Sequence, residues 1–222
     1  MTVETPEFIR TTRTSYDTIA DDYSEQFADH LAHSPLERSL LGAFAELVGV
    51  DGDGAPAPVA DLGSGPGHVT ARLHALGVPV FGVDVSPRMV ELARRAHPGL
   101  RFHVGSMTSL DLPAGTLGGI VALYSIIHVP HEHLPVVFAE FHRVLVPGGH
   151  VLLMFQFDEH ERGRHLAERF GHEISLDYYW HTPDSVAEHL TGAGFRLHAR
   201  VRREPQHEEK LPRGLILARK AA

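Results

Sequence analysis

Apolar residues recur at helical spacing in the first part of the chain. Over residues 8–31 they lie three, four or seven positions apart and would form one face of a helix: Ile9, Tyr16, Ile19, Tyr23 and Phe27. A second helix is predicted from Pro35 to about residue 48, because proline is favoured at the first position of a helix. The following segment, DGDGAPAP (51–58), is rich in turn-forming residues and predicts a linker.

Beyond residue 57, short apolar runs alternate with segments of helical periodicity. The runs that predict strands are VADLG (59–63), VPVFGVD (78–84), LRFHVG (100–105), GGIVALYSI (118–126) and GGHVLLMFQF (148–157). The predicted helices are GHVTARLHALG (67–77), SPRMVELARRAH (86–97), HEHLPVVFAEFHRVLV (131–146) and TPDSVAEHLTGAG (182–194). Residues 195–204 and 212–220 predict a closing antiparallel pair of strands. This alternation predicts a doubly wound α/β fold, a mostly parallel sheet covered on both faces.

The segment DLGSGPGH (61–68) follows the first predicted strand, where doubly wound sheets bind ligands. One glycine would suffice for a tight turn, but Gly63, Gly65 and Gly67 leave three alternate positions without side chains. The sequence therefore predicts a ligand that lies against the backbone. The dinucleotide fingerprint G-x-G-x-x-G is not matched, because His68 stands where its third glycine belongs. An NAD-dependent oxidoreductase is thus the weaker alternative.

Asp84 ends the second predicted strand, about 20 residues after the glycine loop. A carboxylate at this position typically accepts hydrogen bonds from ribose hydroxyls. The alternative is that Asp84 caps the next helix, but Ser86 already occupies the N-cap position. The ligand is predicted to contain ribose and to place a second polar group near Asp61.

Seven segments, in this order and spacing, carry a resemblance to a known family: YDTIADDY (16–23), DLGSGPG (61–67), FGVDVSPRMVELAR (81–94), GSM (105–107), LYSIIHVPHEHL (123–134), FHRVLVPGGHVLL (141–153) and TPDSVAEHLTGAGF (182–195). The chain resembles the class I S-adenosylmethionine (SAM) dependent methyltransferases of the small-molecule type. The resemblance implies a Rossmann-like sheet of seven strands, mostly parallel with an antiparallel last strand, and an N-terminal helical lid. It implies one methyltransferase domain made of a lid (1–50), a SAM-binding core (57–156), a substrate cover (157–181) and a closing part (182–222).

The resemblance also implies roles for individual residues. Asp61 would hold the amino group of SAM and Asp84 the ribose hydroxyls, while Val85 and Met107 would enclose the adenine. The full set of implied cofactor contacts is Tyr23, Asp61, Gly63, Ser64, Gly65, Gly67, Asp84, Val85, Ser106, Met107 and Tyr124. Ser106 departs from the family pattern, which often has an aspartate there, and a neutral acceptor binds the adenine amino group more weakly. Gly118 departs as well, where an acidic residue is common.

The implied reaction moves a methyl group from SAM to an oxygen, nitrogen or carbon atom of a small molecule and leaves S-adenosylhomocysteine. His128 follows the fourth predicted strand, and because imidazole titrates near neutral pH it is the candidate general base. Orienting the acceptor and packing at the helix start are its alternatives. Tyr16, Tyr178 and Trp180 are predicted to contact the acceptor, although the aromatic residues of the cover equally suit burial against the sheet or a dimer contact. A protein of this fold that binds SAM without transferring its methyl group stays an alternative.

Composition narrows the partners further. The 222 residues include no cysteine, which excludes disulfides and thiolate metal sites, and the 18 histidines lack the spacing of metal ligands. A net charge of −8 without a basic stripe disfavours nucleic acid. The N-terminal residues have no apolar segment and no run of 18 apolar residues occurs, so neither a signal peptide nor a membrane span is expected. We expect a cytoplasmic monomer or homodimer without a metal, nucleic-acid or membrane partner.

Overall fold

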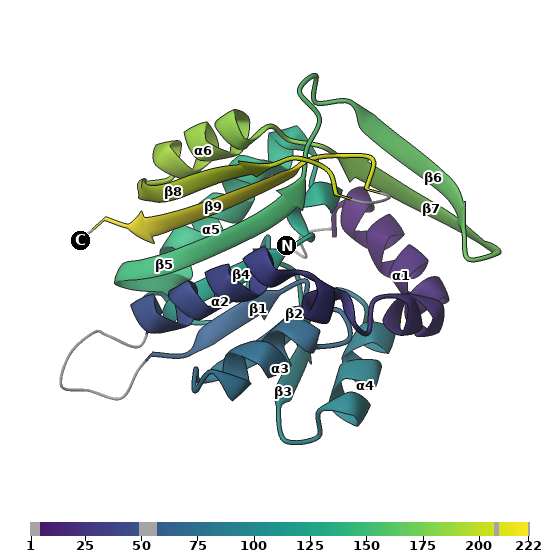
Figure 1. The fold of residues 1–222 in the computed structure, drawn as a ribbon, viewed down its shortest axis with the longest axis horizontal. Helices are drawn as coiled ribbons and strands as arrows, with labels where there is room; N and C mark the ends of the chain where they lie inside the picture. The colour runs from purple at the N-terminus through teal and green to yellow at the C-terminus, as the bar shows by residue number, and fades with distance from the viewer. Residues whose placement is uncertain (1–4, 49–56, 207–208, 222) are drawn as a thin grey trace.

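A seven-stranded sheet in the order β3-β2-β1-β4-β5-β9-β8 forms the centre of the molecule (Figure 1). The computed structural model describes residues 5–48, 57–206 and 209–221. Strands β1 to β5 are parallel, and β9 runs antiparallel to both of its neighbours. The strands of the sheet are β1 (Val59–Leu62), β2 (Val80–Asp84), β3 (Arg101–Val104), β4 (Leu117–Leu123), β5 (Leu145–Gln156), β8 (Phe195–Arg203) and β9 (Arg213–Lys220). The predicted doubly wound α/β fold is confirmed.

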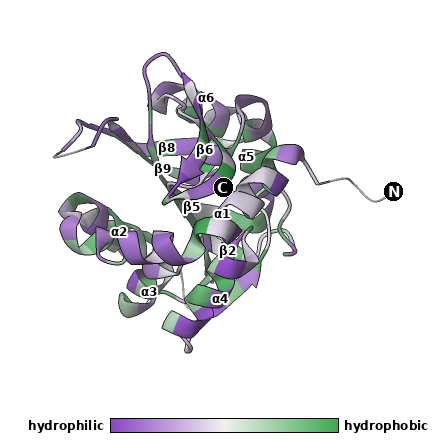
Figure 2. Cartoon of the chain, turned by 90° about the vertical axis from the view of Figure 1, so that its right-hand side faces the viewer, coloured by the Kyte–Doolittle hydropathy of each residue, from purple (hydrophilic) through white to green (hydrophobic). Residues whose placement is uncertain are grey.

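Helices cover both faces of this sheet, since alternate residues of the strands bury apolar side chains on opposite sides. Ile120 and Leu153 pack with α5 and α6, whereas Val121 and Leu152 pack with α2 and α3. The α-helices are α1 (Glu7–Gln26), α2 (Pro35–Val48), α3 (His68–Ala75), α4 (Pro87–Ala96), α5 (Leu134–Val144) and α6 (Pro183–Gly192). Bands of hydrophilic and hydrophobic residues alternate along α2 and α4 (Figure 2), as expected for helices with one buried side. None of the helices in the described residues has the length and hydropathy needed to cross a membrane.

Two predicted helices differ from the observed ones at their ends. The first ends at Gln26 instead of residue 31, and a 3-10 turn, η1 (His30–His33), follows. Arg38 holds this turn by donating to the carbonyls of Leu31 and Ala32. The helix predicted over 131–146 begins with a 3-10 turn, η3 (His131–His133), and ends at Val144. Its predicted last two residues belong to β5, because Leu145 pairs with Leu117 of β4.

The predicted substrate cover contains a hairpin that the apolar pattern did not indicate. Strands β6 (Gly163–Arg169) and β7 (His172–Tyr179) pair antiparallel and extend from the body of the molecule beside α1 (Figure 1). Ser15 of α1 donates to the carbonyl of Ser175 in β7 at 2.9 Å and accepts from its N–H at 3.2 Å. The hairpin and α1 are thereby joined. Of the predicted linker, residues 51–56 lie outside the described residues.

Candidate functional site

The glycine loop leaves β1 at the carboxyl edge of the sheet, and its three glycines meet different surroundings. A Cβ atom on Gly63 would lie 2.3 Å from the Cβ of Ser125, and one on Gly67 would lie 2.7 Å from the ring of Phe102. A Cβ on Gly65 would have no atom within 4 Å. All three have positive φ, which favours glycine. Gly63 and Gly67 therefore let the loop pack closely, and Gly65 is the glycine that faces open space.

Asp84, at the end of β2, joins this loop to the start of α4. Its Oδ2 accepts from the N–H of Gly65 at 2.8 Å, and its Oδ1 accepts from the N–H of Ser86 at 2.9 Å. Ser86 caps α4 through its own hydroxyl, which accepts from the N–H of Met89. Burial raises the pKa of Asp84 to about 6, against the lowering effect of the backbone hydrogen bonds. An ionised carboxylate has about four acceptor sites, so the two that these bonds use leave others for a ligand.

A cavity lies beside Gly65 and Asp84, and both residues line it. Ten residues predicted for the cofactor or the acceptor line it: Tyr16, Tyr23, Gly63, Gly65, Asp84, Val85, Ser106, Met107, Tyr124 and His128. The Ser106 hydroxyl is 2.9 Å from that of Thr108, which the sequence reasoning missed. Phe8 and Ile9 of α1 also line this first cavity and were missed, although both are apolar residues of the predicted lid helix.

A second cavity adjoins the first, because six residues line both: Tyr16, Tyr23, Gly63, Gly65, Leu123 and Tyr124. Three further predicted residues lie along it: Asp61, Ser64 and Tyr178. Asp61 is almost fully buried and accepts from the Thr70 hydroxyl at 2.6 Å, and burial raises its pKa to about 7. Gly67 and Trp180 line neither cavity. The sequence reasoning missed six charged or polar residues of this second cavity: His30, His68, Gln156, Arg169, Glu209 and Arg213.

His128 lies in the short turn η2 (Ile126–His128) after β4 and is 6% exposed. Its Nδ1 is 2.8 Å from the carbonyl oxygen of Asp177, so this nitrogen carries the hydrogen. Its Nε2 therefore accepts, and the Oη of Tyr16 donates to it at 2.8 Å. Burial lowers the pKa of His128 to about 4 and raises that of Tyr16 well above its ordinary value. The site thus holds a neutral imidazole with one basic nitrogen.

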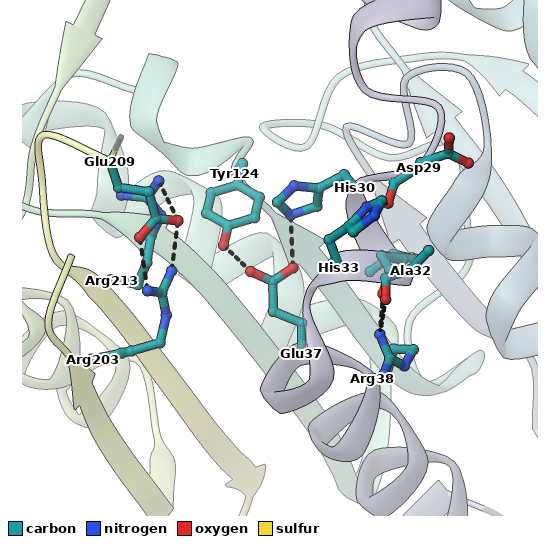
Figure 3. Close-up of polar contacts among 11 residues, drawn as sticks. Asp29, His30, Ala32, His33, Glu37, Arg38, Tyr124, Arg203, Glu209 and Arg213 are labelled. Atoms are coloured by element: carbon teal, nitrogen blue, oxygen red, sulfur yellow. Dashed lines mark hydrogen bonds and ion pairs between the residues drawn. The ribbon is translucent and has the colours of Figure 1, made fainter. Parts of the chain in front are cut away.

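Tyr124 stands at the boundary of the two cavities in a left-handed conformation, with φ of 54°. A non-glycine residue in this region is strained and persists where its surroundings hold it. Its hydroxyl donates to Oε1 of the buried Glu37 in α2, whose Oε2 is 2.9 Å from Nε2 of His30 (Figure 3). Two segments of the N-terminal region therefore fix the tyrosine between the cavities.

The N-terminal helix is also bound to the start of α4. Asp17 of α1 accepts from the Ser86 hydroxyl at 2.6 Å and from the N–H of Arg88 at 3.1 Å. Arg88 forms an ion pair with Asp21 at 2.9 Å. These contacts lie two to four residues after Asp84 in the sequence. They hold α1 beside the first cavity.

Comparison with known proteins identifies this arrangement. Residues 59–149, which hold the glycine loop, Asp84 and His128, match a family model described as a methyltransferase domain. This part of the chain is therefore a methyltransferase domain. A demethylmenaquinone methyltransferase from Chlorobaculum parvum is 29% identical over 140 residues, which cover 62% of this chain and 56% of that protein. The chain thus spans little more than half the length of this curated relative.

Two solved methyltransferase structures share the fold over almost the whole chain. Magnesium protoporphyrin IX methyltransferase from Synechocystis PCC 6803, with bound SAM, has a TM-score of 0.71 at 15% identity and covers 99% of this chain and 100% of that chain. The 1,6-didemethyltoxoflavin-N1-methyltransferase from Burkholderia thailandensis, with bound 1,6-didemethyltoxoflavin and S-adenosylhomocysteine, has a TM-score of 0.68 at 24% identity. The match covers 99% of this chain and 94% of the Burkholderia protein. At these identities the likeness establishes the fold.

Proposed function

We propose that this methyltransferase moves a methyl group from SAM to an oxygen, nitrogen or carbon atom of a small molecule. The observation that carries the proposal is the first cavity. There the backbone of Gly65 is open to a ligand, and the N–H of the same residue holds the carboxylate of Asp84. A backbone free of side chains beside a fixed carboxylate suits a nucleoside, because ribose hydroxyls donate to the carboxylate.

The residues around this cavity suit the parts of SAM. The free acceptor sites of Asp84 would take the ribose hydroxyls, and the side chains of Val85 and Met107 offer apolar surfaces to the adenine. Ser106 offers a neutral acceptor to the adenine amino group. Asp61, in the adjoining second cavity, would hold the ammonium group, because a nearby positive charge favours its ionised form.

The reaction assigned to the site is a single in-line displacement. SAM supplies a methyl group on a sulfonium, which is a good leaving group. The residues of the chain contribute mainly alignment, which is a large part of catalysis when two reactants are held in line. We assign the acceptor to the second cavity, close to Tyr124 and Tyr16, which line both cavities.

We assign His128 the role of base, which accepts the proton that the methyl acceptor releases. Its Nε2 is unprotonated, and Tyr16 donates to that nitrogen. Because burial lowers the pKa of His128 to about 4, the imidazole is a weak base at neutral pH. It therefore orients a protonated acceptor first and takes the proton as methyl transfer makes the acceptor acidic. We assign α1 the role of lid and the β6–β7 hairpin that of substrate cover.

Calorimetric titration with SAM, S-adenosylhomocysteine and NADH tests the cofactor. Incubation of the protein with methyl-labelled SAM and a fractionated metabolite extract then tests the transfer. SAM binding together with label in a small molecule supports the proposal. SAM binding without any transfer favours a binding protein of the same fold. Binding of NADH but not of SAM overturns the proposal.

A further inference from the structure

The second cavity holds an arginine that no carboxylate of the described residues approaches within 4.0 Å. Arg169, the last residue of β6, donates through Nη1 to the hydroxyl of Tyr178 at 2.8 Å. Its Cζ lies 5.4, 5.6 and 4.9 Å from the ring centroids of Tyr23, Phe27 and Phe170. Aromatic faces attract a cation and hold it in place without neutralising it. The guanidinium is thus fixed in position with its charge available to a ligand.

The charge of Arg169 acts on the part of the site where the acceptor would react. Burial is the main cause of the pKa shifts of Tyr23, Tyr178 and His128, and the positive charge of Arg169 is a further cause in each. The partner strand β7 contacts His128 directly through the Asp177 carbonyl. Arg169 therefore belongs to the acceptor side of the cavity. Asp61 and Ser64 of the glycine-loop segment line the cavity too.

A second arginine lines this cavity from β9. Arg213 pairs in register with Gln156 of β5, and its Nη2 is 3.1 Å from Oε1 of Glu209. Glu209 also pairs with Arg203 at 2.7 Å, so two guanidiniums share one carboxylate (Figure 3). The group of Arg203, Glu209 and Arg213 therefore carries a net positive charge, although the net charge of the whole chain is −8.

Some of the residues that line this cavity also carry buried polar atoms without a hydrogen bond within the described chain. The Nε of Arg213 and the Oε1 of Gln156 are buried without a hydrogen bond within the described chain, as are the Oγ of Ser64 and the Nε2 of His68. Buried polar atoms in native proteins nearly always have a partner. A donor and an acceptor side by side on neighbouring strands indicate a polar ligand group there.

We propose that the methyl acceptor is a small carboxylic acid with an apolar or aromatic body, and that its carboxylate binds Arg169. This inference rests on the proposed function. A guanidinium matches the planar carboxylate, to which it donates two parallel hydrogen bonds. Arg213 and Gln156 would bind a second polar group, and Phe27, Leu123 and Ile127 would contact the apolar body. The methionine end of SAM is the other possible source of a carboxylate.

The test uses Arg169→Gln, which removes the charge, and Arg169→Lys, which keeps it. Arg101→Gln is the matched control, because Arg101 is exposed at the start of β3 and lines neither cavity. Each protein is first titrated with SAM. Each is then saturated with S-adenosylhomocysteine and titrated with paired compounds, such as benzoate and benzamide, 4-hydroxybenzoate and 4-hydroxybenzamide, and cinnamate and cinnamamide.

We expect the wild-type protein to bind at least one acid about tenfold more tightly than its amide, the scale of one charge-assisted contact. Arg169→Gln should abolish this preference, Arg169→Lys should keep part of it, and Arg101→Gln should keep all of it. SAM affinity should stay within about threefold in all three variants.

Three results would overturn the inference. Amides that bind as well as acids, or the absence of acid binding up to about 5 mM, show that the cavity does not recognise a carboxylate. A tenfold loss of SAM affinity in Arg169→Gln, on the scale of about 1.4 kcal/mol, assigns Arg169 to SAM. A wild-type protein that does not bind SAM overturns the proposed function itself, and this separate titration distinguishes the two failures.

Discussion

The Oη of Tyr16 lies 2.8 Å from the Nε2 of His128, which joins the N-terminal helix to the turn that follows β4. The bond requires a neutral imidazole, and the Asp177 carbonyl on the other ring nitrogen fixes the tautomer. Tyr16 of α1 and the candidate base His128 are therefore linked by a hydrogen bond. Whatever proton the acceptor gives up must compete with the tyrosine hydroxyl for the same nitrogen.

Replacing His128 separates catalysis from binding. If Nε2 takes the proton of the acceptor, His128→Ala should lower turnover by roughly 100- to 10,000-fold and leave SAM affinity nearly unchanged. The wild-type rate should fall in acid near the pKa of about 4, since only the neutral imidazole accepts a proton, and the variant should lack this limb. An unaltered acid limb in pH–rate profiles of the variant would exclude the role as base.

Tyr16→Phe provides the matched variant. Removing the hydroxyl removes a hydrogen bond to the neutral form of His128, so the pKa of the imidazole should rise. The acid limb of the rate should then move to higher pH. A limb that stays in place in Tyr16→Phe would show that the hydrogen bond does not control the histidine.

SAM affinity should depend on pH through Asp61. Burial raises the pKa of Asp61 to about 7, and only the ionised carboxylate attracts an ammonium. Affinity should therefore be full above pH 7 and fall by up to about tenfold per pH unit below it. Asp61→Asn should bind more weakly at pH 8 and lose the dependence. Asp111→Asn, at an exposed residue lining neither cavity, should titrate like the wild type in calorimetry from pH 8 to 6.

Two glycines of the loop should respond differently to substitution by alanine. Gly63→Ala places a Cβ 2.3 Å from that of Ser125 and should lower the free energy of unfolding by about 3 kcal/mol or more. Gly65→Ala meets no atom within 4 Å and should cost only about 1–2 kcal/mol for its positive φ. Its methyl group would project toward the ligand and should weaken SAM binding at least about tenfold. Urea unfolding and calorimetry measure the two effects, and intact SAM binding by Gly65→Ala would contradict the assignment.

His181 should make folding sensitive to acid. It is fully buried, donates to the Val129 carbonyl at 2.9 Å, and has a pKa lowered from 6.5 to about 4, mainly by burial. The unfolded chain takes up a proton as the pH falls below 6.5, whereas the folded chain does not until about 4. Stability is therefore lost through this window, by roughly 2 kcal/mol between pH 7 and pH 5.

His181→Gln removes this proton uptake. Urea unfolding should show a smaller loss of stability between pH 7 and pH 5 in the variant than in the wild type. Asp61 and Asp84, whose raised pKa values act in the opposite direction, are present in both proteins and cancel in the comparison. Equal losses in the two proteins would contradict the role of His181.

The sequence predicted the sheet and the glycine loop because their signals are local. Apolar runs, the proline and serine that begin α4, and the glycines act within a few residues of one another. The hairpin had no such signal. Most side chains of β6 are exposed, and its turn uses Phe170 and Gly171, both with positive φ, instead of the usual asparagine–glycine pair.

The missed site residues depend on contacts between distant segments. Arg213 lines the second cavity because β9 pairs with β5 in the register that sets it opposite Gln156. Glu37 shares the buried face of α2 with Leu41, Phe44 and Val48, and His30 and Tyr124 bind its carboxylate there. The partners of both residues come from other segments of the chain, so the sequence alone did not reveal their place in the site.

The affinity of the wild type and Asp84→Ala for SAM tests the central claim most directly. Asp84 orients the site through the N–H groups of Gly65 and Ser86 and would accept from the ribose. We predict binding in the micromolar range for the wild type and a loss of about 1.5–3 kcal/mol in the variant, the scale of a hydrogen bond to a charged group. Circular dichroism confirms that the variant is folded. A wild-type protein that binds NADH but not SAM, or a folded variant that binds SAM as tightly as the wild type, would contradict the claim.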